Sequence, residues 1–371
     1  MDGHRNLRHF LAVLLLPALA GCGTAEFYWQ GFTGQLDLFT RARPIADVAE
    51  TTSDPRLKER LQNVQAIRRY ASRELALPDN GSYTRYADLG RPFVVWNVFA
   101  APELALTPRQ WCFPVAGCVN YRGYFAEADA RAEAARLAAA GDDVHVGGVP
   151  AYSTLGYFDD PVLSTFIAYR EPDLARLVFH ELAHQVVYVK DDTAFNESFA
   201  VAVEEEGLKR WLVAQQGRPD AGAFAAHVAR GDRLRAEFRA LVRRTRERLA
   251  ALYASDAPDA DKRAGKAAAL AGMRAEYAAL KAGWDGAPAF DRWFAGGANN
   301  AGIAAAGLYT DRLPQFRALL EAEGGDLPRF YARVKALAAL SKAEREGALA
   351  AYAPAPPAPA THPLVLKSEI R

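Results

Sequence analysis

Residues 180–200 read HELAHQVVYVKDDTAFNESFA, and the first five of these residues decide how the chain folds around its candidate site. They lie in Pro172–Val189, where apolar residues recur at helical spacing after an acidic start that suits a helix N-terminus. Because His180 and His184 are four residues apart, a helix places both imidazoles on one face, with Glu181 beside them. The pattern predicts that the two histidines bind one zinc ion, which in catalytic sites takes three protein ligands.

The third ligand must come from another segment, and Glu197 is the best placed. The segment Asn196–Ala200 (NESFA) lies on the next expected helix, which runs to about Gln215 after a turn at residues 190–193. Two helices joined by so short a turn can pack antiparallel and direct Glu197 towards the histidines. Glu204, seven residues later on the same helical face, is the alternative third ligand.

The same motif points to hydrolytic chemistry. Zinc lowers the pKa of a bound water towards about 7, and Glu181 is expected to act as the general base that takes the proton of this water. The developing oxyanion needs a further donor. We expect Tyr309 to supply it, and the alternatives are Tyr253, Tyr277 and Tyr152.

HELAH followed by NESFA resembles the gluzincin zinc peptidases, and NESFA is most similar to their aminopeptidase branch. The spacer of twelve residues between the second histidine and the glutamate is shorter than in the alanyl-aminopeptidase-like enzymes. A more specific resemblance is to a family of bacterial lipoproteins named for an inferred aminopeptidase activity. It rests on Gly117–Phe125, Gly147–Pro161 and the zinc motif, and it covers most of residues 22–350. It implies a gluzincin-like fold, a peptide substrate and an aminopeptidase activity.

The segment Asp143–Phe158 is rich in β-formers but is interrupted by glycine and proline, which favours an edge strand. An exposed edge beside a zinc cleft can pair with an extended peptide, and we expect Gly148, Ala151 and Tyr152 to contact substrate. An ordinary strand that closes a small sheet is the alternative. Aminopeptidases of the branch that NESFA resembles carry a glutamate on this segment, yet no glutamate occurs between Asp142 and Arg170. The exopeptidase prediction therefore depends on the resemblance, whereas the zinc prediction depends on the ligands.

Residues 1–22 have the pattern of a secretory signal. Two arginines precede a short apolar run, and the segment ends in Leu-Ala-Gly-Cys at Cys22. This ending resembles a bacterial lipobox, which implies cleavage before Cys22 and lipid attachment to it, whereas an uncleaved signal anchor is the alternative. The resemblance places the protein at the cell envelope, facing the periplasm, and Gly23 favours the outer membrane.

Only Cys112 and Cys118 remain once Cys22 is set aside. An isolated pair in an exported protein predicts a disulfide that closes a small loop. A second metal site is the weaker alternative, because zinc seldom binds two thiolates alone.

The order of expected elements predicts a predominantly helical α+β protein, with a small antiparallel or mixed sheet beside the zinc helix pair. We expect one peptidase domain over residues 23–352. Strands are confined to about 83–158, helices fill about 172–350, and a Pro-rich disordered tail follows over 353–371. Within the helical part, residues 223–254 and 260–282 are expected to form a hairpin.

The net charge of +1 gives no field that would indicate a nucleic-acid partner. Three functions remain open: a zinc aminopeptidase, a zinc endopeptidase, and a non-catalytic envelope protein that binds peptides. The sequence leaves the natural substrate and the oligomeric state undetermined.

Overall fold

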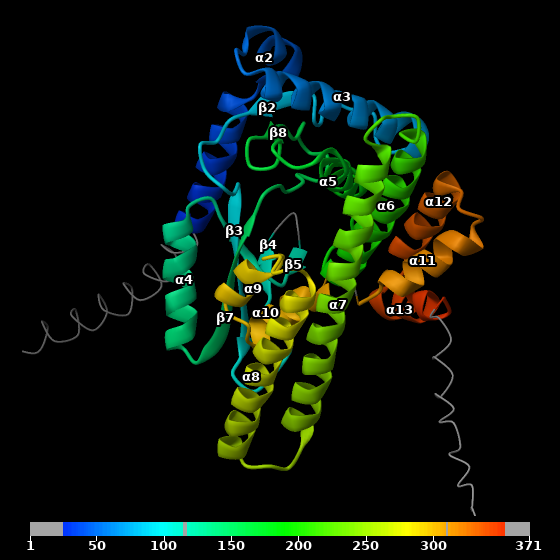
Figure 1. Ribbon diagram of the computed structural model, residues 1–371. Helices are drawn as coiled ribbons and strands as arrows, with labels where there is room; N and C mark the ends of the chain where they lie inside the picture. Colours follow the sequence, from blue (N-terminus) through cyan, green and yellow to red (C-terminus); the bar gives the residue numbers. More distant parts are fainter. Residues whose placement is uncertain (1–24, 114–116, 309–310, 353–371) are drawn as a thin grey trace, which may run out of the picture.

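The computed structural model describes residues 25–113, 117–308 and 311–352. The expected signal sequence, Cys22, Tyr309 and the expected tail therefore lie outside the described residues. The described part is predominantly helical with small sheets, which confirms the α+β prediction at this level (Figure 1).

The largest sheet has the strand order β6-β3-β7, and all its pairs are antiparallel. Alternate side chains of β3 enter different cores, as the two-residue period of a strand requires. Trp96 and Val98 pack with α4, whereas Phe99 packs with α10 on the opposite face. The strands are β3 (Val95–Pro102), β6 (Arg122–Tyr124) and β7 (Asp142–Val149), and the covering helices are α4 (Glu127–Ala139) and α10 (Asn300–Leu308).

Two smaller sheets complete the strand content. One joins β1 and β2 antiparallel and β2 and β8 parallel, and the other is the two-stranded β4-β5 ribbon. β1 and β8 lie outside residues 83–158, so the expected limit on the strands is wrong. The bounds are β1 (Arg43–Pro44), β2 (Arg85–Ala87), β4 (Trp111–Phe113), β5 (Gly117–Val119) and β8 (Val162–Leu163).

A second correction concerns the strand expected over residues 119–125. The structure divides it between β5, which pairs with β4, and β6, which pairs with β3. The chain thus changes partner strand at Asn120 and Tyr121, which lie between the two strands. Hydrophobic pattern alone cannot reveal such a change, because each half is an acceptable strand.

From residue 171 onwards the described chain is mainly helical, as expected. The hairpin of α7 and α8 is confirmed and extends away from the rest of the molecule in Figure 1. The helices of this part are α5 (Glu171–Ala183), α6 (Thr193–Ala214), α7 (Ala221–Ala254), α8 (Asp259–Gly283), α9 (Asp291–Ala295), α11 (Leu313–Ala322), α12 (Leu327–Ala338) and α13 (Lys342–Ala350). At the start of the described chain a helix spans residues 25–41, and α2 (Ile45–Thr51) and α3 (Pro55–Leu75) follow β1.

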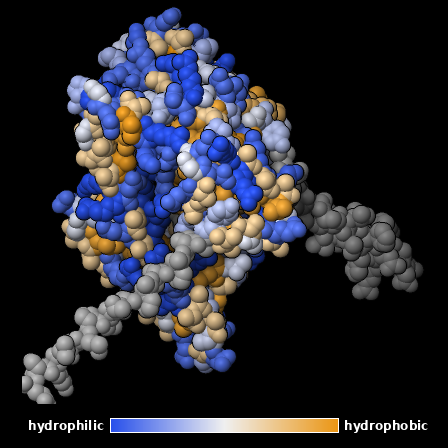
Figure 2. Space-filling view, turned by 90° about the vertical axis from the view of Figure 1, so that its right-hand side faces the viewer, coloured by the Kyte–Doolittle hydropathy of each residue, from blue (hydrophilic) through white to orange (hydrophobic). Residues whose placement is uncertain are grey.

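The main core lies around α5 and α6. Phe179 of α5 and Phe199 of α6 are fully buried, and both belong to the cluster that also holds Phe316 of α11 and Phe330 of α12. A separate aromatic cluster around Phe238 and Trp284 holds the α7–α8 hairpin together. The outer face in Figure 2 is mainly hydrophilic, with apolar side chains in small groups, as is usual for a folded domain.

Among the described helices, none combines the length and the apolar character that crossing a membrane requires.

Candidate metal centre and its cleft

The two helices that carry the HELAH and NESFA motifs are held close together. An added Cβ at Gly207 of α6 would lie 2.9 Å from Cδ2 of Phe179 on α5, so only glycine permits this approach. The loop between the helices is fixed from both sides. The Asn196 side chain accepts a hydrogen bond from the N–H of Val189 at 2.8 Å and donates one to its carbonyl at 2.7 Å. Asp192 accepts from the N–H of Phe195 and so caps α6.

The two hydrogen bonds between Asn196 and the backbone of Val189 explain why α5 is shorter than expected. The helix ends at Ala183, six residues before Val189, and His184 occupies its C-cap. The next residues form turns in which Gln185 and Val186 donate to carbonyls three residues back. Because Asn196 takes both backbone groups of Val189, these groups are not available to continue the helix. The predicted helix start, with Pro172 in the first turn, is confirmed.

The structure brings His180, His184 and Glu197 together. The two Nε2 atoms are 3.2 Å apart, and Oε2 of Glu197 lies 3.4 Å from Nε2 of His180 and 3.8 Å from Nε2 of His184. A tetrahedral zinc ion with bonds of about 2.0–2.1 Å separates its ligand atoms by about 3.3–3.4 Å. The three atoms therefore fit the edges of a zinc coordination shell. Among the described residues, they form the one group of His, Cys, Asp and Glu side chains found suitable for a metal.

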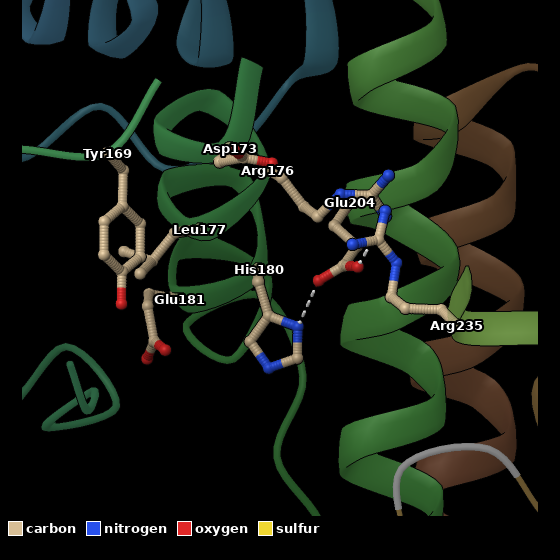
Figure 3. Close-up of a pocket in the computed structure, with 8 residues that line it drawn as sticks. All are labelled: Tyr169, Asp173, Arg176, Leu177, His180, Glu181, Glu204 and Arg235. Carbon is tan, nitrogen blue, oxygen red and sulfur yellow. Dashed lines mark hydrogen bonds and ion pairs between the residues drawn. The ribbon is translucent and has the colours of Figure 1, made fainter. Parts of the chain in front are cut away.

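Glu204 contacts the opposite side of His180. Its Oε2 lies 2.8 Å from Nδ1 of His180, and its Oε1 accepts a hydrogen bond of 3.1 Å from Arg176, as Figure 3 shows. A histidine that binds a metal through Nε2 commonly donates its other N–H to a carboxylate, which fixes the tautomer and the ring orientation. The alternative of Glu204 as third ligand thus does not fit this geometry, in which Glu204 instead orients His180.

The pKa values of His180, His184 and Glu197 depend on two opposing effects. Burial disfavours the charged form of each side chain, and the nearby partners favour it. Burial alone would lower the pKa of His180, but hydrogen bonds with Glu197 and Glu204 raise it well above its usual value. Burial lowers the pKa of His184 to about 4, against the attraction of Glu197. Burial opposes ionisation of Glu197, yet the two histidines keep its pKa below normal. His184 is thus neutral at pH 7 and Glu197 is ionised, which are the forms that bind metals.

Nδ1 of His184 is buried without a hydrogen-bond partner among the described residues. The two histidines therefore differ, because only His180 has a carboxylate on its second nitrogen. Binding through Nε2 requires the proton of a neutral imidazole to stand on Nδ1. In His184 no described group accepts a hydrogen bond from this nitrogen.

Glu181 lines the same cleft, and its carboxylate forms no ion pair within the described chain. Burial raises its pKa to about 7; His180 opposes this shift, whereas Glu197 and Asp160 add to it. A carboxylate whose pKa lies near neutrality suits proton transfer in both directions. A bound dication would lower this pKa, because positive charge favours the ionised form.

The cleft above these side chains has a volume of about 490 Å³. Two of the three predicted substrate contacts, Ala151 and Tyr152, line it. Gly148 lines an adjoining cavity instead. An added Cβ at Gly148 would lie 2.2 Å from Cδ2 of Phe93, so close packing already requires glycine there.

The structure separates the tyrosine candidates for the oxyanion donor. Tyr253 donates to Asn300 at 2.9 Å, and Tyr277 donates to Asp291 at 2.7 Å within the aromatic cluster of the hairpin; neither tyrosine lines the metal cleft. Tyr152 does line the cleft, but its hydroxyl donates to Gln35. Tyr309 lies outside the described residues.

The lining residues that sequence reasoning did not find include Asn97, Tyr121 and Tyr188. Burial raises the pKa of Tyr121, and nearby Glu197 adds to the effect; the pKa of Tyr188 is raised for the same two reasons. Both hydroxyls therefore stay protonated and able to donate. A signal for Tyr121 existed, because it lies within the segment 117–125 that carries the family resemblance, whereas Asn97 lay unmarked in the centre of a strand.

The strand β7 lies at the edge of its sheet, as the glycine and proline pattern predicted. Its first half is covered, because Asn299 donates to the carbonyl of Val144 at 2.8 Å and Nδ1 of His145 lies 3.1 Å from the carbonyl of Gly297. In an antiparallel edge strand, residues two apart direct their backbone groups to the same side. Gly148 therefore presents its N–H and C=O on the same outer edge as Val144, beyond the covered part.

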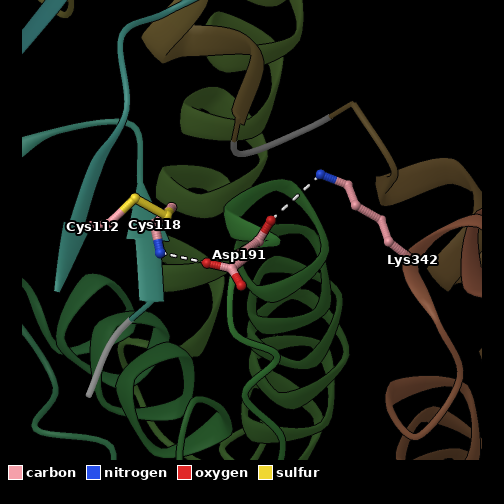
Figure 4. Close-up of a disulfide and its surroundings, with 4 residues drawn as sticks. All are labelled: Cys112, Cys118, Asp191 and Lys342. Atoms are coloured by element: carbon pink, nitrogen blue, oxygen red, sulfur yellow. Dashed lines mark hydrogen bonds between the residues drawn. A yellow bond between two sulfur atoms is a disulfide. The ribbon is translucent and has the colours of Figure 1, made fainter. Parts of the chain in front are cut away.

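Cys112 and Cys118 are joined by a disulfide across the β4-β5 ribbon (Figure 4). The N–H of Cys118 donates to the side chain of Asp191, and Lys342 of α13 donates to the carbonyl of Asp191 at 3.4 Å. Asp191 lies in the loop between α5 and α6 and has a φ of 64°, an unfavourable conformation for a residue with a Cβ. The disulfide-bonded ribbon therefore supports the loop that joins the two site helices.

Fold and site together define a predominantly helical α+β protein with a candidate three-ligand metal centre in a cleft. The chain belongs to the family described as "Putative aminopeptidase", whose model matches residues 26–349. This membership supports a peptidase function. No curated protein and no solved structure matches the chain.

Proposed function

We propose that this protein is a zinc-dependent peptidase in which His180, His184 and Glu197 hold one zinc ion. The observation that carries the proposal is the mutual spacing of the three ligand atoms, 3.2, 3.4 and 3.8 Å, in a cleft that also holds Glu181. A structural zinc site usually fills all four positions with protein ligands. Here three ligands face a cleft, an arrangement that favours catalysis over a purely structural role.

When bound, zinc would acidify a water molecule and polarise the carbonyl of the scissile bond. Glu181 takes the proton from the attacking water and delivers it to the leaving amine. Glu204 and Arg176 keep the ring of His180 in one orientation through the contacts at 2.8 and 3.1 Å. The protonated hydroxyls of Tyr121 and Tyr188 line the cleft and are our candidates for stabilising the oxyanion.

The family membership supports cleavage at a free N-terminus. The acids that line the cleft bear on whether such an N-terminus can be bound. An aminopeptidase needs an anion for the substrate's ammonium group, yet Glu181 and Glu197 are the only acids among the described residues that line the metal cleft. Asp160 is buried and accepts from the N–H of Thr154 at 3.0 Å, whereas Asp159 is exposed. This observation keeps an endopeptidase as the second candidate.

The decisive experiment measures zinc content and peptide hydrolysis for the parent and for Glu181→Gln, with Glu206→Gln on α6 as the control. We expect about one zinc per chain in all three proteins. Hydrolysis should fall at least 1,000-fold only in Glu181→Gln, because a missing general base and its polar contacts cost several orders of magnitude. Peptides with free and acetylated N-termini separate the exopeptidase from the endopeptidase. Zinc without turnover of either peptide by the parent would contradict the enzyme and leave a peptide-binding protein.

We also propose that the chain is lipid-anchored at Cys22 in the bacterial envelope and faces the periplasm. The Leu-Ala-Gly-Cys ending of the signal supports this address, and a disulfide between Cys112 and Cys118 suits an oxidising compartment. Labelled palmitate should enter the parent but not Cys22→Ser. Equal labelling of both proteins would contradict the anchor.

A further inference from the structure

The metal cleft adjoins a larger cavity of about 810 Å³ beside α7. Asn97 and Val149 line both spaces. Arg235 lines the larger cavity and also a third one of about 450 Å³, which reaches His180 and Glu181. In Figure 3 the side chain of Arg235 extends from α7 towards the region of Arg176 and Glu204. The three cavities therefore lie next to one another, between the candidate metal centre and α7.

The wall that α7 contributes to this cavity is basic. Arg235, Arg239 and Arg243 are four residues apart, and Arg246 follows three later, so helical periodicity places all four on one face. All four line the cavity, and Arg317 of α11 joins them. Like charges spaced four apart destabilise a helix, and solvated helices normally alternate acids with bases. This stripe thus has an energetic cost, and it lines the cavity although Arg243 keeps 71 % of its side-chain surface exposed.

Nearby acids neutralise only part of the stripe. Arg246 pairs with Asp311 at 2.8 Å, Arg317 with Glu205 at 2.7 Å and Arg235 with Asp232 at 2.7 Å. Asp311 is the one acid among the described residues that line the cavity.

Arg239, in the middle of the stripe, has no hydrogen bond or ion pair within the described chain. Partial burial lowers its pKa; Glu205 opposes this shift, whereas Arg317 and Arg235 add to it. A half-buried cation between two other cations is a position that an incoming anion would stabilise.

The wall opposite the arginines is the uncovered end of β7. Gly147, Gly148 and Val149 line the same cavity, and strand periodicity directs the N–H and C=O of Gly148 to the outer edge, the side on which an extended chain would pair. A peptide that adds to this edge directs alternate side chains away from the sheet. Such a peptide would lie between a backbone edge and a row of guanidinium groups.

We propose that the arginine-lined cavity binds a carboxylate of the peptide substrate, with Arg239 as its principal partner, and so selects acidic peptides. This inference rests on the proposed peptidase function. The carboxylate has two possible sources, an Asp or Glu side chain near the cleaved bond or the free C-terminus of a short peptide. Both present the planar anion that a guanidinium group recognises.

The test uses the zinc-loaded full chain in detergent and four matched fluorogenic peptides. The peptides carry Glu or Gln beyond the cleaved bond, and each is made with a free and an amidated C-terminus. Arg239→Gln removes the cation. Arg248→Gln, an exposed arginine of the same helix that does not line the cavity, is the matched control. The parent should prefer the carboxylate-bearing peptides about 10- to 100-fold in kcat/KM, the range expected of a charge-assisted hydrogen bond.

Arg239→Gln should abolish this preference with little effect on the amidated Gln peptide, and Arg248→Gln should retain it. Arg239→Glu should favour a Lys peptide instead, which a general loss of folding would not produce. The preference of the parent should also fall with added salt. A dependence on side chain or on C-terminus identifies the source. Equal rates for all four peptides, or a preference that survives in Arg239→Gln, would overturn the inference.

Binding separates this inference from the proposed function. The Glu181→Gln protein should bind a labelled Glu peptide about 10- to 100-fold tighter than the Gln peptide, and adding Arg239→Gln should remove the difference. If the parent cleaves nothing but this difference appears, the peptidase proposal fails and the carboxylate site remains. If the parent cleaves peptides without any difference in binding or rate, the carboxylate site fails alone.

Discussion

The helix pair α5–α6 and helix α7 of the hairpin line adjoining cavities but differ in how their charged side chains are paired. On α5 and α6 the charged groups are mostly enclosed, and Glu197 and Glu204 each contact a histidine. On α7 the charges are arginines at helical spacing, and one of them, Arg239, has no partner in the described chain. Helices α5 and α6 belong to the main hydrophobic core, whereas α7 and α8 pack around a small aromatic core of their own.

This difference shows how burial relates to the kind of site. A buried charge is tolerated when its partners are fixed, and fixed partners also set the geometry that a metal requires. A charge at a cleft wall retains part of its hydration and can remain unpaired until a ligand arrives. The buried charges of α5 and α6 therefore suit metal binding and catalysis, whereas the more exposed arginines of α7 suit ligand recognition.

The largest expected effect on the α5–α6 site comes from removing Glu197, the proposed third zinc ligand. Glu197→Ala should lose stoichiometric zinc and all measurable hydrolysis, because two histidines alone leave the metal site incomplete. Metal analysis after gel filtration, beside Glu205→Ala as a control on the same helix, measures this effect. If Glu204→Ala loses zinc while Glu197→Ala stays loaded, the assignment of the two glutamates is reversed.

A smaller effect is expected from a change that disturbs the orientation of His180 but removes no zinc ligand. Glu204→Gln keeps the size of the side chain but removes the charge that faces Nδ1 of His180 at 2.8 Å. Zinc affinity should fall about 10- to 100-fold, the usual effect of losing such a partner. Competition with a chelating dye measures the affinity, and restoration by Glu204→Asp would identify the carboxylate as the cause. An unchanged affinity in Glu204→Gln would mean that the contact does not position the histidine.

The smallest expected effect concerns Asp160, a buried acid that forms no ion pair within the described part of the chain. Burial raises its pKa from 3.8 to about 6, although hydrogen bonds from Thr154 and Ser153 oppose the shift. The folded state therefore binds more protons than the unfolded state between these values, so this group's contribution to stability falls as pH rises from about 4 to 6. This pKa shift corresponds to a destabilisation of about 3 kcal/mol at pH 7. Because an amide accepts weaker hydrogen bonds than a carboxylate, Asp160→Asn should recover only part of it, so its free energy of unfolding at pH 7 should rise by about 1–2 kcal/mol.

Urea unfolding of the parent and Asp160→Asn at pH 4, 5.5 and 7 checks this sign. The two proteins should have similar free energies of unfolding at pH 4 and should diverge towards neutrality. A parent that gains stability relative to Asp160→Asn as pH rises would show that the hydrogen bonds, rather than burial, dominate at this carboxyl.

Much of the site was accessible from the sequence because its members are local. His180, Glu181 and His184 share one helix, and Glu197 follows after a turn, so periodicity alone places them near one another. The edge position of β7 was also predictable, since glycine and proline disfavour a central strand. The end of α5 was not, because it depends on the side chain of Asn196, thirteen residues beyond Ala183.

Contacts between distant segments explain the remaining differences. Asn97 enters the cleft only because β3 lies between β6 and β7, and Tyr121 enters because the chain changes partner strand there. The sequence placed Arg239 only within an expected helical hairpin, and the tertiary arrangement that sets α7 across a cavity from β7 and α11 makes its face a cavity wall.

The sequence by itself determined the metal-binding motif, the helix pair that carries it and the helical character of the C-terminal part. Helical and strand periods are local properties, and residues four apart need no tertiary information to share a face. Tertiary structure alone decided which glutamate faces which side of His180, where α5 ends, and that the α7 arginines line a cavity beside the candidate metal centre. Those outcomes depend on which distant surfaces bury one another, and pairwise burial is not encoded in any single segment.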